Sequence, residues 1–334
     1  MKQLFDLINK LTSEYPKLTD IHITENENII VRELGNLHKT NEKAIDVSFI
    51  NEVIDEKKKN IFKTKNSVDF SLSSNSVRLR LHVYKSSDKT CIAIRILPDL
   101  KNIEQNDDLS EEIAQIQSGL VIISGPAGSG KSTFLAQILN KINTKYTKHC
   151  ITIEDPVEYK FTSEKSLIHQ REIGSDVENF HQGVLDSLRE DMNVLVIGEM
   201  RDENTMRAAL LAAETGHLVL TTLHNKTADE AIGRIVHACR DEKEIRQILA
   251  SQLRFVISQK LYFHNKKIFT LREILKCTKP VARLIRDGKD QQIKSYIELG
   301  NDKMITMKQS AMQIARKTKM NFRETEDLLK FVSL

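Results

Sequence analysis

The segment GPAGSGKS, residues 125–132, matches the phosphate-binding pattern GxxxxGK[ST]. The apolar run LVIIS (120–124) before it predicts a buried strand, and FLAQILNKI (134–142) after it predicts a helix. A glycine-rich turn between a strand and a helix is the context in which backbone N–H groups surround phosphates. The alternative is an incidental glycine turn, for which these flanking elements would not be required. The pattern therefore predicts a nucleotide-binding α/β domain.

The residue types within this loop indicate which ligand it binds. Glycines let the backbone turn its N–H groups inward, Lys131 would neutralise the β- and γ-phosphates, and the Ser132 hydroxyl would ligate Mg²⁺. The predicted cofactors are therefore ATP and Mg²⁺. The predicted nucleotide-binding residues are Gly125, Pro126, Ala127, Gly128, Ser129, Gly130, Lys131, Ser132 and Thr133.

Further apolar runs and acidic residues follow the loop. The runs CITI (150–153), VLVI (194–197) and LVL (218–220) alternate with stretches of helical spacing, which predicts a largely parallel sheet covered on both faces. The carboxyl ends of such strands gather beside the phosphates. Acids stand at two of these ends, and hydrolysis needs groups that orient water and hold the metal, so they are candidates for both tasks. These acids are Glu154, Asp155, Glu158 and Glu199. Solvated loop residues or helix N-caps are the alternative for each of them.

Two histidines flank an apolar run in ETGHLVLTTLH, residues 214–224. His217 and His224 are seven residues apart in the chain, too far for one helical turn and awkward for a shared metal ion. If the run between them is a buried strand, both imidazoles lie near its ends. A structural role, in which the imidazole is only a hydrogen-bonded packing group, is the alternative for either histidine.

The chain on either side of this region has different patterns. Residues 2–12 have helical spacing, and residues 77–83 and 92–96 alternate as a hairpin with one apolar and one basic face. DLKNIEQNDDLS (99–110) is predicted to be a polar linker. Residues from about 228 to 334 are predicted to be helical. The amphipathic stripe that supports this prediction consists of Ile245, Ile248, Leu249, Leu253, Val256 and Ile257.

Composition excludes several classes of protein. The net charge of +4, the aromatic share of 5% and the lack of tryptophan argue against a nucleic-acid partner. The four cysteines contain no CxxC pair, so neither a zinc ribbon nor a disulfide framework is predicted. No apolar run approaches the roughly 20 residues of a membrane span, and the start lacks a signal peptide. We therefore expect a cytoplasmic protein that meets a membrane only peripherally.

Four motifs in this order resemble those of the secretion-type hexameric ATPases, the motors of type IV pili and type II secretion. GPAGSGKST, ITIEDPVEY, LVIGEMRD and AAETGHLVLTTLH look like the Walker A, Asp box, Walker B and His box of that family, and TDIHIT is similar to its N-terminal signature. The resemblance implies an α/β chain with a PAS-like α+β N-terminal domain (1–98), a linker (99–112), a RecA-like ATPase domain (113–270) and a helical C-terminal region (271–334). It also implies a homo-hexameric ring with ATP bound between its domains.

The resemblance also implies roles for individual residues. Glu158 matches the Asp-box glutamate that activates water, Glu199 the Walker B glutamate that stands with Ser132 at the metal, and His217 and His224 the His box. Arg80 and Arg95 match N-terminal arginines that contact phosphates, although exposed arginines are often only solvated. Other matching arginines are Arg171, Arg189, Arg201 and Arg207. The chain departs from the pattern at Leu185, where the family has an arginine, and at Met192-Asn193, which replaces Pro-Asp.

The direction of work is predicted to be pilus retraction. Extension and secretion members usually carry a longer N-terminal region and often a four-cysteine metal module, neither of which is seen here. KPVARLIRDGK (279–289) is similar to the AIRNLIRE signature of the retraction branch, with Ala282 in place of its first arginine. A plain amphipathic helix is the alternative. Residues 276–334 hold 13 Lys or Arg against 7 Asp or Glu, so this region could face an acidic loop of an inner-membrane platform protein, or anionic lipid. An extension or type II secretion motor, a nucleic-acid translocase and a non-hydrolysing scaffold are the competing functions.

Overall fold

The computed structural model describes residues 2–44, 46, 50–54, 56–73, 77–97, 107–265 and 267–333. The chain divides into two compact units, residues 1–103 and residues 104–334, and each is described by itself. No helix in the described residues combines the length and the apolar character that a membrane span requires.

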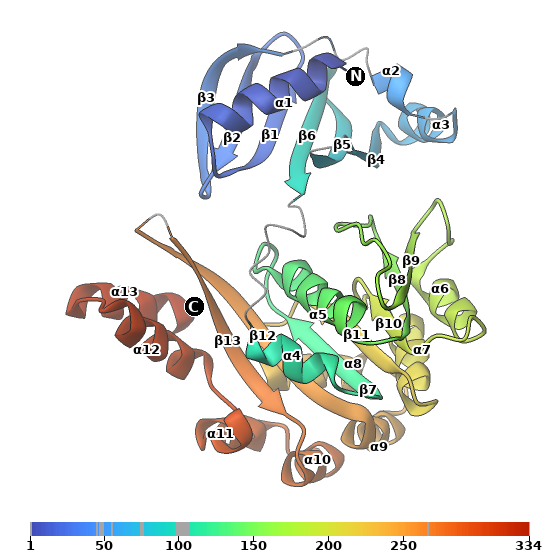
Figure 1. The fold of residues 1–334 in the computed structure, drawn as a ribbon, viewed down its shortest axis with the longest axis vertical. Coiled ribbons are helices and arrows are strands. Elements are labelled where there is room, and N and C mark those ends of the chain that lie inside the picture. The colour runs from blue at the N-terminus through green and yellow to red at the C-terminus, as the bar shows by residue number, and fades with distance from the viewer. Residues whose placement is uncertain are drawn as a thin grey trace. The chain divides into compact units, whose positions relative to one another are not determined.

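The first unit is an antiparallel sheet covered on one face by a helix (Figure 1). Its six strands lie in the order β3-β2-β1-β6-β5-β4. The alternation of β5 and β6 directs Leu79, Leu81 and Ile94 into a core with Leu4 and Ile8 of α1, which is why one face is apolar. The elements are α1 (Lys2–Glu14), β1 (Leu18–Thr24), β2 (Asn28–Glu33), β3 (Asn36–Lys43), α2 (Ile50–Val53), α3 (Glu56–Lys65), β4 (Ser67–Ser73), β5 (Arg78–Ser86) and β6 (Lys89–Leu97).

The second unit is built around a seven-stranded sheet in the order β13-β12-β7-β11-β10-β8-β9. All neighbouring strands are parallel except β12 and β13, which pair as an antiparallel hairpin. The elements from its start to the hairpin are α4 (Asp108–Ala114), β7 (Gly119–Ser124), α5 (Lys131–Lys145), β8 (His149–Glu154), β9 (Leu167–Glu172), α6 (Phe180–Ser187), β10 (Val194–Ile197), α7 (Glu203–Glu214), β11 (Leu218–Leu223), α8 (Ala228–Ala238), α9 (Glu242–Gln252), β12 (Leu253–His264) and β13 (Lys267–Lys276).

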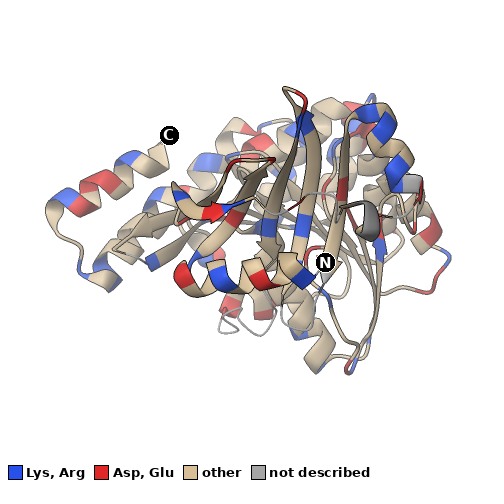
Figure 2. Cartoon of the chain, turned by 90° about the horizontal axis from the view of Figure 1, so that it is seen from above, with Lys and Arg blue, Asp and Glu red and all other residues tan. Residues whose placement is uncertain are grey.

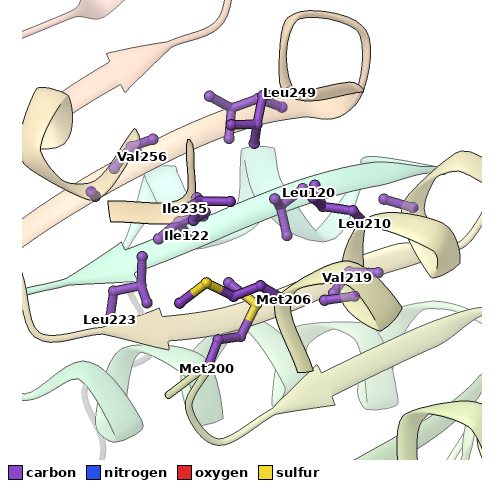
Figure 3. Close-up of a cluster of buried hydrophobic side chains, with 14 of the residues drawn as sticks. Leu120, Ile122, Met200, Met206, Leu210, Val219, Leu223, Ile235, Leu249 and Val256 are labelled. Carbon is purple, nitrogen blue, oxygen red and sulfur yellow. The ribbon is translucent and has the colours of Figure 1, made fainter. Parts of the chain in front are cut away.

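Helices cover both faces of this sheet, as the continuously apolar strands predict. Leu120 and Ile122 of β7 pack on one face against residues of α7, α8 and α9 (Figure 3). Val121 and Ile123 point to the other face and pack against α5 and α4. Because every residue of β7 and β11 is buried, neither strand shows the alternation of a half-exposed strand.

The structure corrects the prediction of a helical region from about residue 228 onward. Helix α9 ends at Gln252, and residues 253–264 and 267–276 are the strands β12 and β13. The stripe of Leu253, Val256 and Ile257 is apolar because β12 lies between β7 and β13 and is buried on both faces over these residues. Such a strand has no alternation, so its spacing can imitate that of a helix. The region 271–334 therefore begins with a strand.

The chain after β13 is helical. It consists of α10 (Lys279–Arg286), α11 (Gln291–Glu298), the 3₁₀ turn η3 (Asn301–Lys303), α12 (Met307–Thr318) and α13 (Phe322–Ser333). Helices α12 and α13 bury Met307, Ala311 and Leu328 against Leu271 of β13. At the other end of the unit, α4 begins at Asp108, inside the predicted linker, while residues 99–106 of that linker and Pro98 lie outside the described residues.

Candidate active site

The P-loop runs from the end of β7 to the first residue of α5, as predicted. Gly125, Gly128 and Gly130 have φ values of 142°, 73° and 83°, in the region that side chains disfavour. A Cβ atom on Gly125 would lie 2.3 Å from the carbonyl oxygen of Gln259, so only glycine fits there. Residues 126–128 form the exposed crest of the loop. Their backbone is therefore accessible to a ligand.

Lys131 begins α5 and points back into the loop. Its side chain is 8% exposed, and its ammonium donates hydrogen bonds to the carbonyl oxygens of Gly125 at 2.7 Å and Pro126 at 2.9 Å. Burial lowers the pKa of Lys131, while the nearby carboxylates of Glu199 and Glu158 oppose that shift. The two carboxylates therefore belong to the same electrostatic site as the lysine, as the sequence predicts.

The remaining hydroxyl groups of the loop differ in their partners. The Ser129 hydroxyl is buried, has no hydrogen-bond partner among the described residues, and lies on the same side of Gly125 as the backbone of Gln259. The Thr133 hydroxyl instead lies 2.8 Å from that of Tyr159, and burial raises the pKa of Tyr159 to about 12. Tyr159 is therefore a neutral hydrogen-bonding group that ties the segment after β8 to helix α5.

Glu158 is held in place by a buried neighbour. The backbone N–H of Glu158 donates to a carboxylate oxygen of Glu154 at 3.2 Å, and the other oxygen accepts from Thr152 at 2.8 Å. Gln170 of β9 donates to the backbone oxygen of Tyr159 at 2.7 Å and to Glu154 at 3.3 Å. Burial raises the pKa of Glu154. Of the predicted acids, Glu154 is therefore part of the support of this segment, whereas Glu158 and Glu199 both act on the charge of Lys131.

Glu199 lies at the carboxyl end of β10 between two basic groups. One of its oxygens pairs with the guanidinium of Arg201, and the other lies 3.4 Å from Nε2 of His224. The carboxylate is 15% exposed, whereas the side chains of Arg201 and His224 are 67% and 56% exposed. His224, which lies after the end of strand β11 as predicted, thus contacts Glu199.

His217 lies at the opposite end of the same strand. Because β11 runs parallel to β7, with Leu218 beside Gly119 and Leu223 beside Ser124, the P-loop is at the carboxyl end and His217 at the amino end. Its Nδ1 is 3.0 Å from the carbonyl oxygen of Ala212 and 3.1 Å from the Thr215 hydroxyl. The structure does not bring His217 to the P-loop of its own chain. These contacts fit the structural alternative, in which His217 closes the turn between α7 and β11.

Two of the predicted arginines lie in the first unit, and the other four lie in the second unit. Arg80 and Arg95 are direct cross-strand partners on β5 and β6 of the first unit, and Nε of Arg95 donates to Asp20 at 2.9 Å. Asp20 belongs to the TDIHIT motif. In the second unit, Arg171 pairs with Glu190 at 2.6 Å, Arg207 with Glu203 at 3.1 Å, and Arg189 donates to the Leu185 carbonyl at 3.5 Å.

Sequence reasoning missed the residues that support the loop from other elements. Gln259 of β12 touches both ends of the P-loop, and no local pattern marks a glutamine that acts 130 residues away in the chain. Tyr159 follows Glu158 directly, so its position within the motif ITIEDPVEY is the sequence feature that could have indicated its supporting role.

The donor set fits a magnesium nucleotide. The turned glycines and the buried lysine provide a phosphate cradle. Among the described residues, no group of three or more His, Cys, Asp or Glu side chains is placed to hold a metal ion by itself. A metal here would therefore take oxygen ligands from Ser132, Glu199 and the nucleotide, the arrangement that Mg²⁺ prefers.

Comparison with known proteins agrees with this site. The family described as type II/IV secretion system protein matches residues 6–326. The twitching motility protein of Neisseria gonorrhoeae is 37% identical over 279 residues, which cover 80% of this chain and 74% of that protein. The type IV pilus retraction ATPase PilT of Pseudomonas aeruginosa is 33% identical over 296 residues, covering 84% of this chain and 85% of that protein.

A solved structure of the pilus retraction motor PilT with bound ADP has a TM-score of 0.83 and 32% identity, covering 96% of this chain and 95% of that one. The similarity thus extends over both units and includes the P-loop. The chain belongs to the type II/IV secretion system protein family and is one of its P-loop ATPases.

Proposed function

We propose that this protein is a Mg²⁺-dependent ATPase motor that powers the retraction of type IV pili. It would work as a homo-hexameric ring at the cytoplasmic face of the inner membrane and act on a platform protein of that membrane. The observation that carries this proposal is the similarity over nearly the whole chain, both units included, to proteins named for twitching motility and pilus retraction.

The residues around the P-loop would divide the chemistry of hydrolysis. Mg²⁺ would neutralise charge on the β- and γ-phosphates, held by Ser132 and Glu199. Lys131 would add positive charge from inside the loop, where burial strengthens its interaction with phosphate. Glu158 would accept the hydrogen bond that orients the attacking water. Its movement is limited because Glu154 binds its backbone N–H and Gln170 binds the backbone oxygen of the next residue, Tyr159.

Basic groups outside the loop would respond to the state of the nucleotide. His224 shares Glu199 with Arg201, so a change of charge at Glu199 on metal binding would alter both contacts. Arg80 and Arg95 would supply further positive charge from the first unit. Because they are neighbours on the sheet, they would act as a pair. His217 has no part in this scheme within its own chain.

Gene deletion tests the direction of work. A strain that lacks the protein should carry surplus surface pili that do not retract, and the wild-type gene should restore retraction while a Lys131→Ala gene should not. A bald strain would contradict retraction and make the protein an extension motor.

A nucleic-acid translocase is expected to carry a continuous basic stripe on its surface. Lysines and arginines are interspersed with acidic residues along the chain, including the helix next to the C-terminus (Figure 2). ATP hydrolysis that is strongly stimulated by DNA or RNA would favour the translocase over the motor of a pilus.

A further inference from the structure

Gln259 of β12 lies against the P-loop on the side away from its crest. Its side-chain amide donates to the backbone oxygen of Ser129 at 2.7 Å, and Gln259 is only 3% exposed. A Cβ atom on Gly130 would lie 2.9 Å from Nε2 of Gln259, and one on Gly125 would lie 2.3 Å from its backbone oxygen. Gln259 therefore leaves no room for a side chain at Gly125 or at Gly130.

Arg272 of β13 holds the side chain of Gln259. The two residues are direct partners in the β12–β13 hairpin, and Nε of Arg272 donates to Oε1 of Gln259 at 3.0 Å. The guanidinium also lies over the ring of Phe134 in the first turn of α5, 4.0 Å from its centroid. Because its amide is engaged at both ends, Gln259 has one favourable orientation, with its N–H groups toward Ser129.

Arg272 also forms an ion pair with Asp107, the N-cap of α4. One Asp107 oxygen pairs with Arg272, and the other accepts from the backbone of Leu109 at 3.0 Å. The side chains of Arg272 and Asp107 are 17% and 18% exposed, so solvent weakens this pair less than a surface pair. A continuous chain of contacts thus joins the P-loop backbone to the start of the second unit.

We propose that Gln259 and Arg272 are positioning residues that hold the P-loop in its phosphate-binding shape, and that Asp107 couples this support to α4. Neither side chain needs to touch the nucleotide. Gln259 fixes the carbonyl of Ser129, which directs the following N–H groups into the loop, and Arg272 fixes Gln259. The inference rests on nucleotide binding at the P-loop and does not depend on the direction of work.

The test is nucleotide affinity, measured by titration of ADP with Mg²⁺ into the full-length protein. Gln259→Leu keeps the approximate volume but removes both hydrogen bonds, and it should raise the dissociation constant about tenfold, as the loss of one or two such bonds predicts. Arg272→Met should raise it by a smaller factor. In the double variant the two effects should not multiply, because Arg272 acts through Gln259.

Two milder variants keep the proposal testable if Gln259→Leu folds poorly. Arg272→Lys preserves a charge for Asp107 but loses the forked contact, so it should recover only part of the affinity lost in Arg272→Met. Asp107→Asn remains a good N-cap while it weakens the ion pair, so it should raise the dissociation constant a few-fold without unfolding α4.

Lys276→Met is the matched control. Lys276 also joins β13 to α4, through a 2.7 Å ion pair with Glu112, but its cross-strand partner in the hairpin is Phe255 and not Gln259. It should leave the affinity for ADP unchanged. If Gln259→Leu and Arg272→Met lower the melting temperature but keep the wild-type dissociation constant, the residues are structural and the proposal is wrong. Absence of ADP binding by the wild-type protein would instead contradict the P-loop assignment itself.

Discussion

Lys131, Glu158 and Glu199 bring one positive and two negative charges together beside the P-loop. An isolated buried ammonium is costly, and the two carboxylates offset part of that cost. They leave a local excess of one negative charge, which Arg201 balances through its ion pair with Glu199. Binding of a metal–nucleotide complex therefore exchanges one set of charge contacts for another.

The depressed pKa of Lys131 predicts that nucleotide affinity falls as pH rises. Phosphate binds the charged amine, and a pKa below the usual lysine value means that the neutral amine appears at a lower pH than in an exposed lysine. Affinity for ADP should therefore already decrease at pH values below 10.5, the ordinary pKa of lysine, with proton uptake on binding measurable by calorimetry. In Lys131→Arg, whose side chain stays charged, this decrease should be absent, and an equal decrease there would exclude Lys131 as its source.

Glu158→Gln should separate binding from hydrolysis. The variant keeps the backbone contact to Glu154 and the whole cradle but cannot accept the proton or orient water as a carboxylate does. Turnover should fall by at least about 100-fold while ATP affinity stays near that of the wild type. Lys131→Ala is the comparison, because it should lose both. Equal turnover of wild type and Glu158→Gln would remove Glu158 from its role.

Arg95 distinguishes a nucleotide-contacting role from a structural one. Its pair with Asp20 is largely exposed on the arginine side, at 58%, so the pair should contribute only about 0–1 kcal/mol to stability. Arg95→Ala should lower turnover roughly tenfold or more with little change in melting temperature. Asp20→Asn breaks the same pair but leaves the arginine, so it should keep its activity. A similar loss of turnover in both variants would show that the pair itself matters.

At the scale of elements, helix α10 is held to the rest of the second unit by one charged contact and one apolar face. The guanidinium of Arg246 in α9 donates to the backbone oxygen of Ile285 in α10 at 3.2 Å, and also to both oxygens of Asp290, the N-cap of α11, at 2.8 and 2.9 Å. Val281 and Ile285 of α10 are buried. The arginines Arg283 and Arg286 are exposed on this helix. Arg283 forms an ion pair with Asp287 at 3.7 Å on the same surface. The segment 279–289 therefore presents two exposed arginines from a helix that is packed against its unit.

This arrangement predicts that the exposed face of α10 serves retraction more than hydrolysis. The double change Arg283→Glu and Arg286→Glu should reduce pilus retraction in cells while ATP turnover of the purified protein stays within about twofold, since surface substitutions seldom disturb the fold. Ile285→Ala is the structural comparison and should cost about 2–5 kcal/mol of stability. Loss of hydrolysis in the charge-reversed variant would contradict a separate role for this face.

At the scale of the whole molecule, each unit has its own apolar core. The buried cluster of the first unit uses residues up to Ile96, and those of the second unit use residues from Leu109 onward. Each core is therefore able to unfold as a separate cooperative unit.

Separate cores predict that nucleotide stabilises the unit that holds the P-loop more than the unit that holds Arg80 and Arg95. In scanning calorimetry, ADP with Mg²⁺ at 100 times its dissociation constant should add about 2.7 kcal/mol to the unfolding free energy of the second unit and shift the transition of the first unit by less. Lys131→Ala should abolish this shift. A single transition that moves as a whole would show that the two units unfold together.

The sequence alone was sufficient for features that depend on neighbours in the chain. The P-loop, the strand before it and the helix after it are local, so their residue types and order determine them. The same holds for the hairpin of β5 and β6, whose alternation is direct evidence of one buried face. The family resemblance added the roles of Glu158 and Glu199, which the structure places beside Lys131.

Only the tertiary structure decided what depends on distant residues. Strand β12 looked helical because burial on both faces removes alternation, and its pairing with β7 is set by a segment more than 100 residues earlier. His217 and His224 look equivalent in sequence, but the parallel direction of β11 sends them to opposite edges of the sheet. Gln259 and Arg272 carry no local signal, because a hydrogen bond to Ser129 arises only when the sheet brings the two segments together.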